Sequence, residues 1–148
     1  MKIGVELVIL FCDTSALMKL LVDEAQSEQL RQISTTVDAI GVCRITWAEA
    51  MAALARLQRE DPISHEDLEQ ARQQLLQSWE TFSIVEVTQP LVETAGQFAD
   101  AFALRGYDSV QLAAAHQLHE QFALPLTFAC FDRRLNQAAK LLKLRVLP

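Results

Sequence analysis

The sequence has little that would divide it into separate units. Its 148 residues include 4 Gly and 4 Pro, and no Gly/Ser/Pro-rich, repetitive or low-complexity tract interrupts it. Such tracts are the usual mark of a linker. A hydrophobic share of 51% also excludes a disordered chain. We therefore expect residues 1–148 to form one domain around a single core.

Closely spaced cysteines are also absent. Cys12, Cys43 and Cys130 form no CxxC pair and no Cys/His cluster with zinc spacing. Each lies in or beside an apolar run, where a free thiol behaves as a small buried hydrophobe. Unpaired thiols are typical of a reducing compartment, so we expect a cytoplasmic protein.

No stretch has the pattern of a secretory signal or a membrane span. Glu6 interrupts the apolar run near the N-terminus, Asp13 closes it, and no small-residue cleavage site follows. The run is also shorter than the roughly 20 residues needed to cross a bilayer. We expect no association with a membrane.

An excess of basic residues is missing as well. The formal net charge is −6, which argues against a generic polyanion-binding protein. Two possibilities remain open. A local basic groove could still bind an anion, or bound metal ions could supply the positive charge at a site.

What the sequence does contain is a regular alternation of apolar runs and helical patterns. Buried strands are expected over 7–12, 39–43 and 124–130, and outer strands over 82–87 and 144–147. Helices are expected over 16–21, 27–34, 47–58, 64–79, 90–104, 109–120 and 133–142. This alternation is typical of a parallel sheet between helical layers. We predict a three-layer α/β/α fold with a central parallel sheet of about five strands.

Four carboxylates occupy comparable places in this pattern. Asp13 and Asp132 directly follow buried strands, whereas Glu49 and Asp108 fall in the first turns of helices. The carboxyl ends of parallel strands meet at one edge of a sheet, where ligands bind. We expect all four side chains to converge there.

Each acid also has a simpler interpretation as a helix cap. Asp is a preferred N-cap, and Thr46 with Glu49 fits a capping box. The apolar, Ala-rich surroundings of the four acids favour a second explanation. Like charges buried together are costly unless cations neutralise them. Ligands that are all oxygens suit Mg²⁺ or Mn²⁺.

The segments around these acids resemble those of a known family. They are 11–20 (Phe-Cys-Asp-Thr-Ser-Ala-Leu-Met-Lys-Leu), 45–54 (Ile-Thr-Trp-Ala-Glu-Ala-Met-Ala-Ala-Leu), 104–113 (Leu-Arg-Gly-Tyr-Asp-Ser-Val-Gln-Leu-Ala) and 131–135 (Phe-Asp-Arg-Arg-Leu). In this order they are similar to the motifs of PIN-domain ribonucleases, and within that family to the VapC toxins of bacterial type II toxin–antitoxin pairs. The resemblance implies a metal-dependent endoribonuclease of RNA, neutralised by a cognate antitoxin and usually a homodimer.

The resemblance also implies roles for individual residues. Asp13, Glu49, Asp108 and Asp132 match the acidic quartet of the family, and Ser15 matches its hydroxyl. We expect Asp13 and Asp108 to be the main ligands of Mg²⁺ or Mn²⁺. Glu49 and Asp132 would act as further ligands or orient water, and Ser15 would hold a ligand or water by a hydrogen bond.

One position departs from the family pattern. Two residues before the last acid the family usually has Thr or Ser, and this chain has Cys130, a weaker hydrogen-bonding group. Nearby cations are open to two interpretations: Lys19, Arg133 and Arg134 either contact RNA phosphates or form a solvated helix face.

The sequence lacks the motifs of two other protein classes that place an Asp after a strand. An aspartyl phosphatase would need a second Asp where Ser15 stands, and Leu17 breaks the Asp-x-Ser-x-Ser pattern of a metal-dependent adhesion domain. A non-catalytic α/β interaction domain remains open. The helices over 47–57 and 68–79 carry more apolar surface than one sheet face needs. We therefore expect a two-fold dimer.

Overall fold

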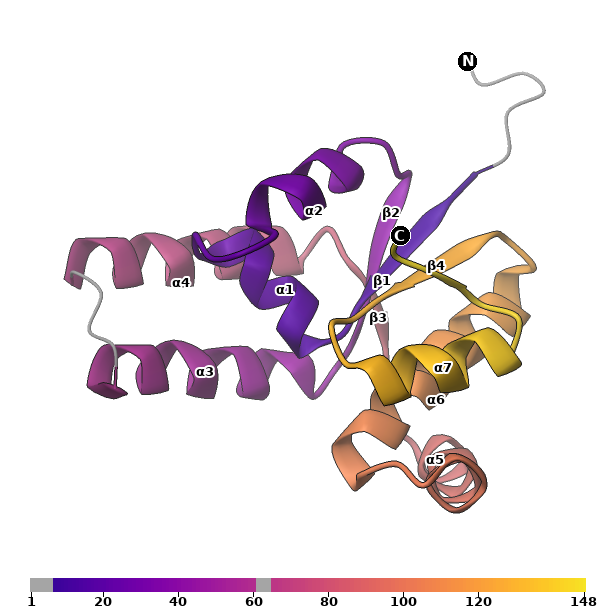
Figure 1. The fold of residues 1–148 in the computed structure, drawn as a ribbon. Coiled ribbons are helices and arrows are strands. Elements are labelled where there is room, and N and C mark those ends of the chain that lie inside the picture. Colours follow the sequence, from indigo (N-terminus) through magenta and orange to yellow (C-terminus); the bar gives the residue numbers. More distant parts are fainter. Residues whose placement is uncertain (1–6, 61–64) are drawn as a thin grey trace.

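The computed structural model describes residues 7–60 and 65–148. A five-stranded parallel sheet runs through it in the order β3-β2-β1-β4-β5 (Figure 1). The strands are β1 (Ile9–Cys12), β2 (Ala39–Cys43), β3 (Ser83–Val85), β4 (Leu126–Ala129) and β5 (Arg145–Val146). This arrangement confirms the predicted parallel sheet, with β1 at its centre.

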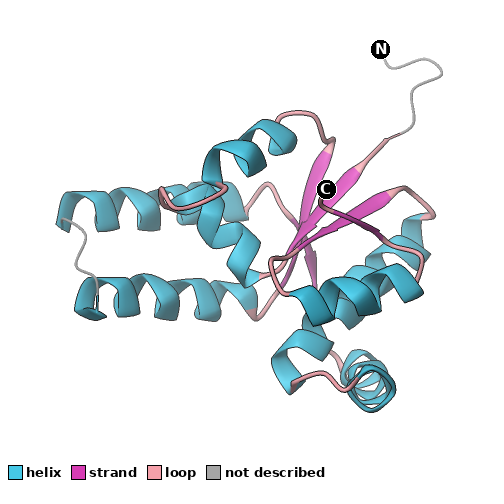
Figure 2. Cartoon of the chain, in the orientation of Figure 1, coloured by secondary structure: helices cyan, strands magenta, loops and turns pink. Residues whose placement is uncertain are grey.

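Helices cover both faces of the sheet (Figure 2). One layer holds α1 (Thr14–Leu21), α2 (Ser27–Ser34), α3 (Thr46–Glu60) and α4 (His65–Trp79). The other holds α5 (Gln89–Phe102), α6 (Gly106–Phe122) and α7 (Arg133–Leu141). The chain moves outward from β1 to β3 and then returns to β4 and β5. Because such crossovers are right-handed, the reversal sends the later helices to the opposite face. The predicted three-layer α/β/α fold is confirmed.

The central strand shows how the sequence specifies this layering. Leu10 and Cys12 pack under α1, α3 and α4, whereas Ile9 and Phe11 pack against α5 and α6. All four are buried, because a strand covered on both faces needs apolar residues at every position. A continuous apolar run therefore lies beneath the point where Asp13 ends the strand.

The boundaries differ from the prediction in one place that affects the site. Helix α6 begins at Gly106, with Arg105 at its N-cap and no side-chain cap, instead of opening after Asp108. Asp108 is therefore the third residue of the helix and not its cap. The expected chain break at residues 61–62 and the start of the next helix at Ser64 lie outside the described residues.

Helices α3 and α4 extend side by side beyond the edge of the sheet (Figure 1). Their inner faces are held by Leu54, Leu68 and Leu75, which are buried with residues of α1. Within residues 7–60 and 65–148, no helix combines the length and the hydropathy needed to cross a membrane.

Candidate functional site

The four acids lie where the parallel strands end. Asp13 follows β1 and its backbone N–H donates to the carbonyl of Ala129 in the neighbouring strand, 3.2 Å away. Asp132 follows β4 after a short turn, so both residues stand at the carboxyl edge of the sheet. Glu49 and Asp108 are in the first turns of α3 and α6.

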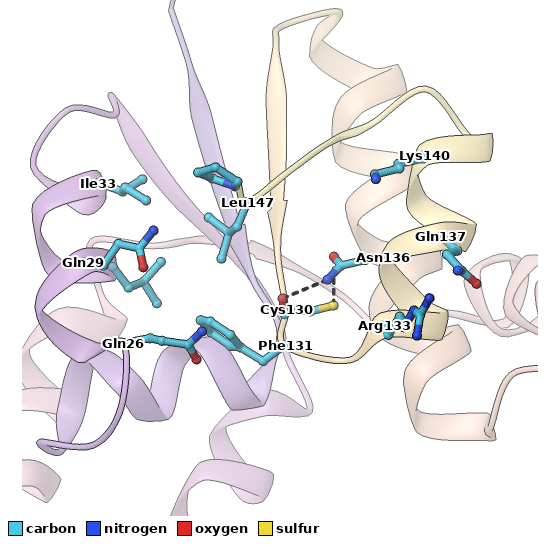
Figure 3. Close-up of a pocket in the computed structure, with 12 residues that line it drawn as sticks. Gln26, Gln29, Ile33, Cys130, Phe131, Arg133, Asn136, Gln137, Lys140 and Leu147 are labelled. Atoms are coloured by element: carbon cyan, nitrogen blue, oxygen red, sulfur yellow. Dashed lines mark hydrogen bonds between the residues drawn. The ribbon is translucent and has the colours of Figure 1, made fainter.

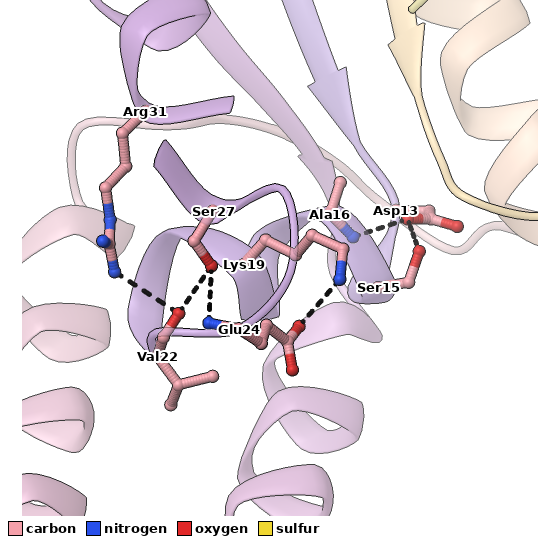
Figure 4. Close-up of polar contacts among 8 residues, drawn as sticks. All are labelled: Asp13, Ser15, Ala16, Lys19, Val22, Glu24, Ser27 and Arg31. Carbon is pink, nitrogen blue, oxygen red and sulfur yellow. Dashed lines mark hydrogen bonds and ion pairs between the residues drawn. The ribbon is translucent and has the colours of Figure 1, made fainter. Parts of the chain in front are cut away.

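Asp13 is both a helix cap and a buried charge. Its Oδ1 accepts hydrogen bonds from the Ala16 backbone N–H at 2.9 Å and from Ser15 Oγ at 2.7 Å (Figure 4). With 7% of its surface exposed, desolvation raises the pKa of Asp13 to about 6, although those two hydrogen bonds oppose the shift. The nearby charges of Asp108 and Glu49 raise it further. The cap uses one carboxylate oxygen, so Oδ2 stays available.

Asp132 and Asp108 complete the acidic side of the site. Asp132 caps α7 by accepting from the Leu135 backbone N–H at 2.8 Å through Oδ1, and it is exposed. Burial raises the pKa of Asp108, and the Asp132 charge raises it as well, whereas Arg105 lowers it and Glu49 adds a smaller rise. The charges of Asp108 and Glu49 act on Asp13, and those of Asp132 and Glu49 act on Asp108, so the four carboxylates form one electrostatic group.

Glu49 does not complete the capping box that the sequence suggested. Its Oε1 accepts hydrogen bonds from Thr14 Oγ1 at 2.8 Å and from Gln111 Nε2 at 3.0 Å. The hydroxyl of Thr46 instead accepts from Gln111 Nε2 at 2.8 Å. The Glu49 side chain is thus turned toward the start of α1 and toward α6, the elements next to Asp13 and Asp108.

Gln111 and Thr14 are two site residues that the sequence analysis did not select. Gln111 is 3% exposed, and its Nε2 joins α6 to α3 through Thr46 and Glu49. Its Oε1 is buried and has no hydrogen-bond partner among the described residues. The sequence held one signal for Gln111: it comes three residues after Asp108, and this spacing places the two side chains on one face of a helix.

Arg105 lowers the pKa of Asp108, but no ion pair with a described residue neutralises the cluster. Within residues 7–60 and 65–148, none of the four carboxylates forms an ion pair with Lys, Arg or His. Nor do any three Asp, Glu, His or Cys side chains there lie close enough to form a ready-made ion cage. The donors are carboxylate and hydroxyl oxygens, the ligand type that Mg²⁺ and Mn²⁺ prefer. The type of donor, though not its present spacing, fits a hard divalent cation.

Cys130 lies under this edge and acts as a neutral donor. Burial raises the pKa of its thiol to about 12, and the charges of Asp13, Asp132 and Asp108 add to the rise. Its Sγ donates to Asn136 Oδ1 at 3.2 Å, while Asn136 Nδ2 donates to the Cys130 carbonyl at 3.2 Å. The pair fixes the turn that presents Asp132.

The three cations near the site differ in availability. Lys19 is held by Glu24 at 3.2 Å and lies 4.8 Å from the centre of the Phe131 ring (Figure 4). Arg134 donates to the Ala103 carbonyl at 3.2 Å. Arg133 has neither a hydrogen bond nor an ion pair from its side chain to any described residue. Of the three, Arg133 is the cation whose side chain no described residue engages.

An apolar groove of about 640 Å³ lies beside the first turns of α3 and α6. It is lined by Arg44, Ile45, Trp47, Ala48, Trp79, Val87, Tyr107 and Val110. Ala48 and Tyr107 directly precede Glu49 and Asp108 in these helices, although the acids themselves do not line the groove. Tyr107 is 71% exposed and Val87 44%, which leaves this surface open to a partner.

Comparison with known proteins adds an independent line of observation. The family model described as PIN domain matches residues 10–141, a range that includes all four acids. Ribonuclease VapC45 of Mycobacterium tuberculosis (strain CDC 1551 / Oshkosh) is 33% identical over 140 residues, 95% of each chain.

Solved structures share the fold at lower sequence identity. VapC20, a sarcin–ricin loop cleaving toxin of Mycobacterium tuberculosis, matches with a TM-score of 0.63 and 16% identity over 87% of this chain and 94% of that one. A toxin–antitoxin complex from Klebsiella pneumoniae matches with a TM-score of 0.58 and 21% identity over 83% and 86%.

Proposed function

This chain belongs to the PIN-domain family, and we propose that it is a metal-dependent endoribonuclease that acts in the cytoplasm as the toxin of a toxin–antitoxin pair. The observation that carries the proposal is the group of four carboxylates, delivered by separate elements to one sheet edge, with no ion pair to a cation among the described residues. The similarity to a ribonuclease along 95% of both chains supports it.

We assign the metal site to Asp13, Asp108, Glu49 and Asp132. Asp13 and Asp108 would be the principal ligands of Mg²⁺ or Mn²⁺, and Glu49 and Asp132 would complete the site or orient water. A bound divalent ion would supply positive charge for the scissile phosphodiester and lower the pKa of a bound water.

The remaining residues would set the direction of these ligands. Ser15 and the α1 backbone hold Oδ1 of Asp13, so its Oδ2 is the atom presented to the site. Thr14 and Gln111 hold Oε1 of Glu49 in the same way. Arg133 is placed to meet an RNA phosphate beside Asp132.

The proposal is tested by incubating purified protein and total RNA with Mg²⁺, Mn²⁺ or EDTA and mapping the new RNA ends. Cleavage should require one of the ions. Asp108→Asn should slow cleavage by more than about 100-fold, because changes outside the ligand shell already cost 10–100-fold. Asp100→Asn, on the exposed surface of α5, is the matched control.

The alternative hypothesis, a non-catalytic interaction domain, predicts the opposite result in this assay. It would give no metal-dependent cleavage under any of these conditions. Cleavage that persists in EDTA, or that Asp108→Asn leaves unchanged, would place the activity outside this site.

We propose further that the antitoxin docks on the apolar groove beside Glu49 and Asp108. An amphipathic helix laid there would bury Ile45 and Tyr107, and an Arg or Lys from it would reach the carboxylates. The toxin–antitoxin complex among the structural neighbours supports a partner of this kind.

A two-fold homodimer remains a prediction. The structure leaves less exposed apolar surface on α3 and α4 to support it than the sequence suggested. Leu54, Leu68 and Leu75 of α3 and α4 are buried within the chain itself, whereas Leu76 is 52% exposed. Light scattering at micromolar concentration and above should nevertheless give the mass of two chains. The 16.6 kDa of a single chain at these concentrations would contradict the prediction.

A further inference from the structure

A second groove opens between α2 and α7 (Figure 3). Its volume of about 510 Å³ is in the range of small-ligand sites. It is lined by Gln26, Gln29, Leu30, Ile33, Cys130, Phe131, Arg133, Asn136, Gln137, Lys140, Leu147 and Pro148. We call it the α2–α7 groove.

The charge of the α2–α7 groove is opposite to that of the protein. Arg133 and Lys140 line it from one face of α7, about two turns apart, and no acid lines it. Neither cation has an ion-pair partner in the described part of the chain. Several other cations of this acidic protein are neutralised, namely Lys19, Arg31, Arg44 and Arg72. The groove therefore favours an anion.

Amide side chains line the α2 wall of the groove. Gln26 and Gln29 come from the α2 side, whereas on α7 the amide of Asn136 is already bonded to Cys130 (Figure 3). Amides both donate and accept hydrogen bonds, so they suit the edge of a nucleobase. Apolar and aromatic surface between the walls, including Phe131, suits the faces of the base.

The position of the groove links it to the acidic site. Cys130, Phe131 and Arg133 all line it, and they flank Asp132 on both sides in the sequence. A strand whose phosphate lies beside Asp132 would therefore place an adjoining nucleotide at the mouth of the groove.

We propose that the α2–α7 groove binds a nucleotide of single-stranded RNA next to the cleaved bond, with its phosphates on Arg133 and Lys140 and its base against the amides of Gln26 and Gln29. The assignment to substrate rests on the ribonuclease function proposed above. The groove would thereby select which base lies beside the cleavage point.

Binding is measured separately from cleavage. Fluorescein-labelled hexamers of adenylate, uridylate and cytidylate are titrated with the full chain in EDTA, and anisotropy is followed over a range of salt concentrations. Lys140→Gln should weaken binding of all three hexamers about fivefold and lower the salt slope by about 0.7, the value for one phosphate contact on a single strand. Lys143→Gln makes the same charge change outside the groove and should have neither effect.

A second variant tests recognition of the base. Gln29→Ala should change the ratio of the affinities for the three hexamers, because it removes an amide that reads the base and keeps both cations. Gln32→Ala, also exposed on α2 but outside the groove lining, is its control. Matching circular dichroism spectra and melting temperatures show that all four variants are folded.

The outcomes separate this inference from the proposed function. If Lys140→Gln and Gln29→Ala bind every hexamer as the wild type does, the groove is not an RNA subsite, even where metal-dependent cleavage is seen. If both variants show the expected changes while no condition gives cleavage, the groove binds RNA and the proposed nuclease function fails. Equal losses of RNA affinity in Lys140→Gln and Lys143→Gln would show that the effect comes from the net charge of the protein and not from the groove, and would overturn the inference.

Discussion

Asp13→Asn is expected to stabilise the protein against urea in EDTA at neutral pH, although it alters the centre of the proposed active site. The folded-state pKa of Asp13 is about 6, above the 3.8 of an unperturbed aspartate, because the carboxylate is buried beside other acids. Ionised Asp13 therefore costs stability. Asn remains a good helix cap, so the bond to the Ala16 N–H can persist.

The size and pH window of the effect follow from linkage. A carboxyl group whose pKa is raised on folding destabilises the native state progressively as the pH rises from about 4 to about 6. A shift of about two units corresponds to about 3 kcal/mol at pH 7.5. The advantage of Asp13→Asn should be nearly absent at pH 4. Urea unfolding at the two pH values measures it, with the exposed Asp100→Asn as control.

Divalent ions should reverse the order of stability. A ligand that binds only the folded state stabilises it by about 4.1 kcal/mol at 1,000 times its dissociation constant, which exceeds the advantage of about 3 kcal/mol expected for Asp13→Asn. Mg²⁺ or Mn²⁺ should therefore raise the melting temperature of the wild type and leave Asp13→Asn nearly unchanged. A wild-type melting temperature indifferent to both ions would count against any metal site among these acids.

The sequence was sufficient for the sheet and for the location of the acids because both depend on local pattern. The run ending at Cys12 is apolar at every position, which in a chain of alternating elements indicates a doubly covered strand. Once the strands are parallel, Asp13 and Asp132 must lie at one edge. A parallel sheet leaves few other places for acids that directly follow its strands.

The direction of the Glu49 side chain could not be predicted in the same way. Thr46 and Glu49 have capping-box spacing, and local propensity favours that box. The observed hydrogen bonds come instead from Thr14 and Gln111, which are 35 and 62 residues away from Glu49 in the sequence. Only the folded arrangement of α1, α3 and α6 brings these partners together.

The predicted start of α6 at residue 109 was wrong for a related reason. Asp108 looked like an N-cap because Arg105 and Gly106 resemble a turn. In the structure the helix includes Gly106, and the Ser109 hydroxyl donates to the Gly106 carbonyl at 2.7 Å. This earlier start leaves Asp108 free of capping and directs it to the acidic group.

Expression of the chain without its partner is expected to stop growth, and the arrest should depend on the acids. Asp13→Asn and Asp108→Asn should each restore growth, because each removes a charge needed to hold the cation while keeping the size of the side chain. Soluble yield and circular dichroism should match the wild type. Asp100→Asn, which lies on an exposed face of α5, should remain toxic.

Co-expression with the proposed cognate antitoxin should also restore growth and yield a stable complex. If its Arg or Lys pairs with the carboxylates, then Asp108→Asn should weaken the complex, since it removes one partner of a charge-assisted hydrogen bond. The apolar contacts at Ile45 and Tyr107 would remain, so binding should fall without being lost. Affinity measured by calorimetry for wild type and Asp108→Asn decides this. If Asp13→Asn stays as toxic as the wild type, the arrest does not arise from this site and the chain acts as a binding module.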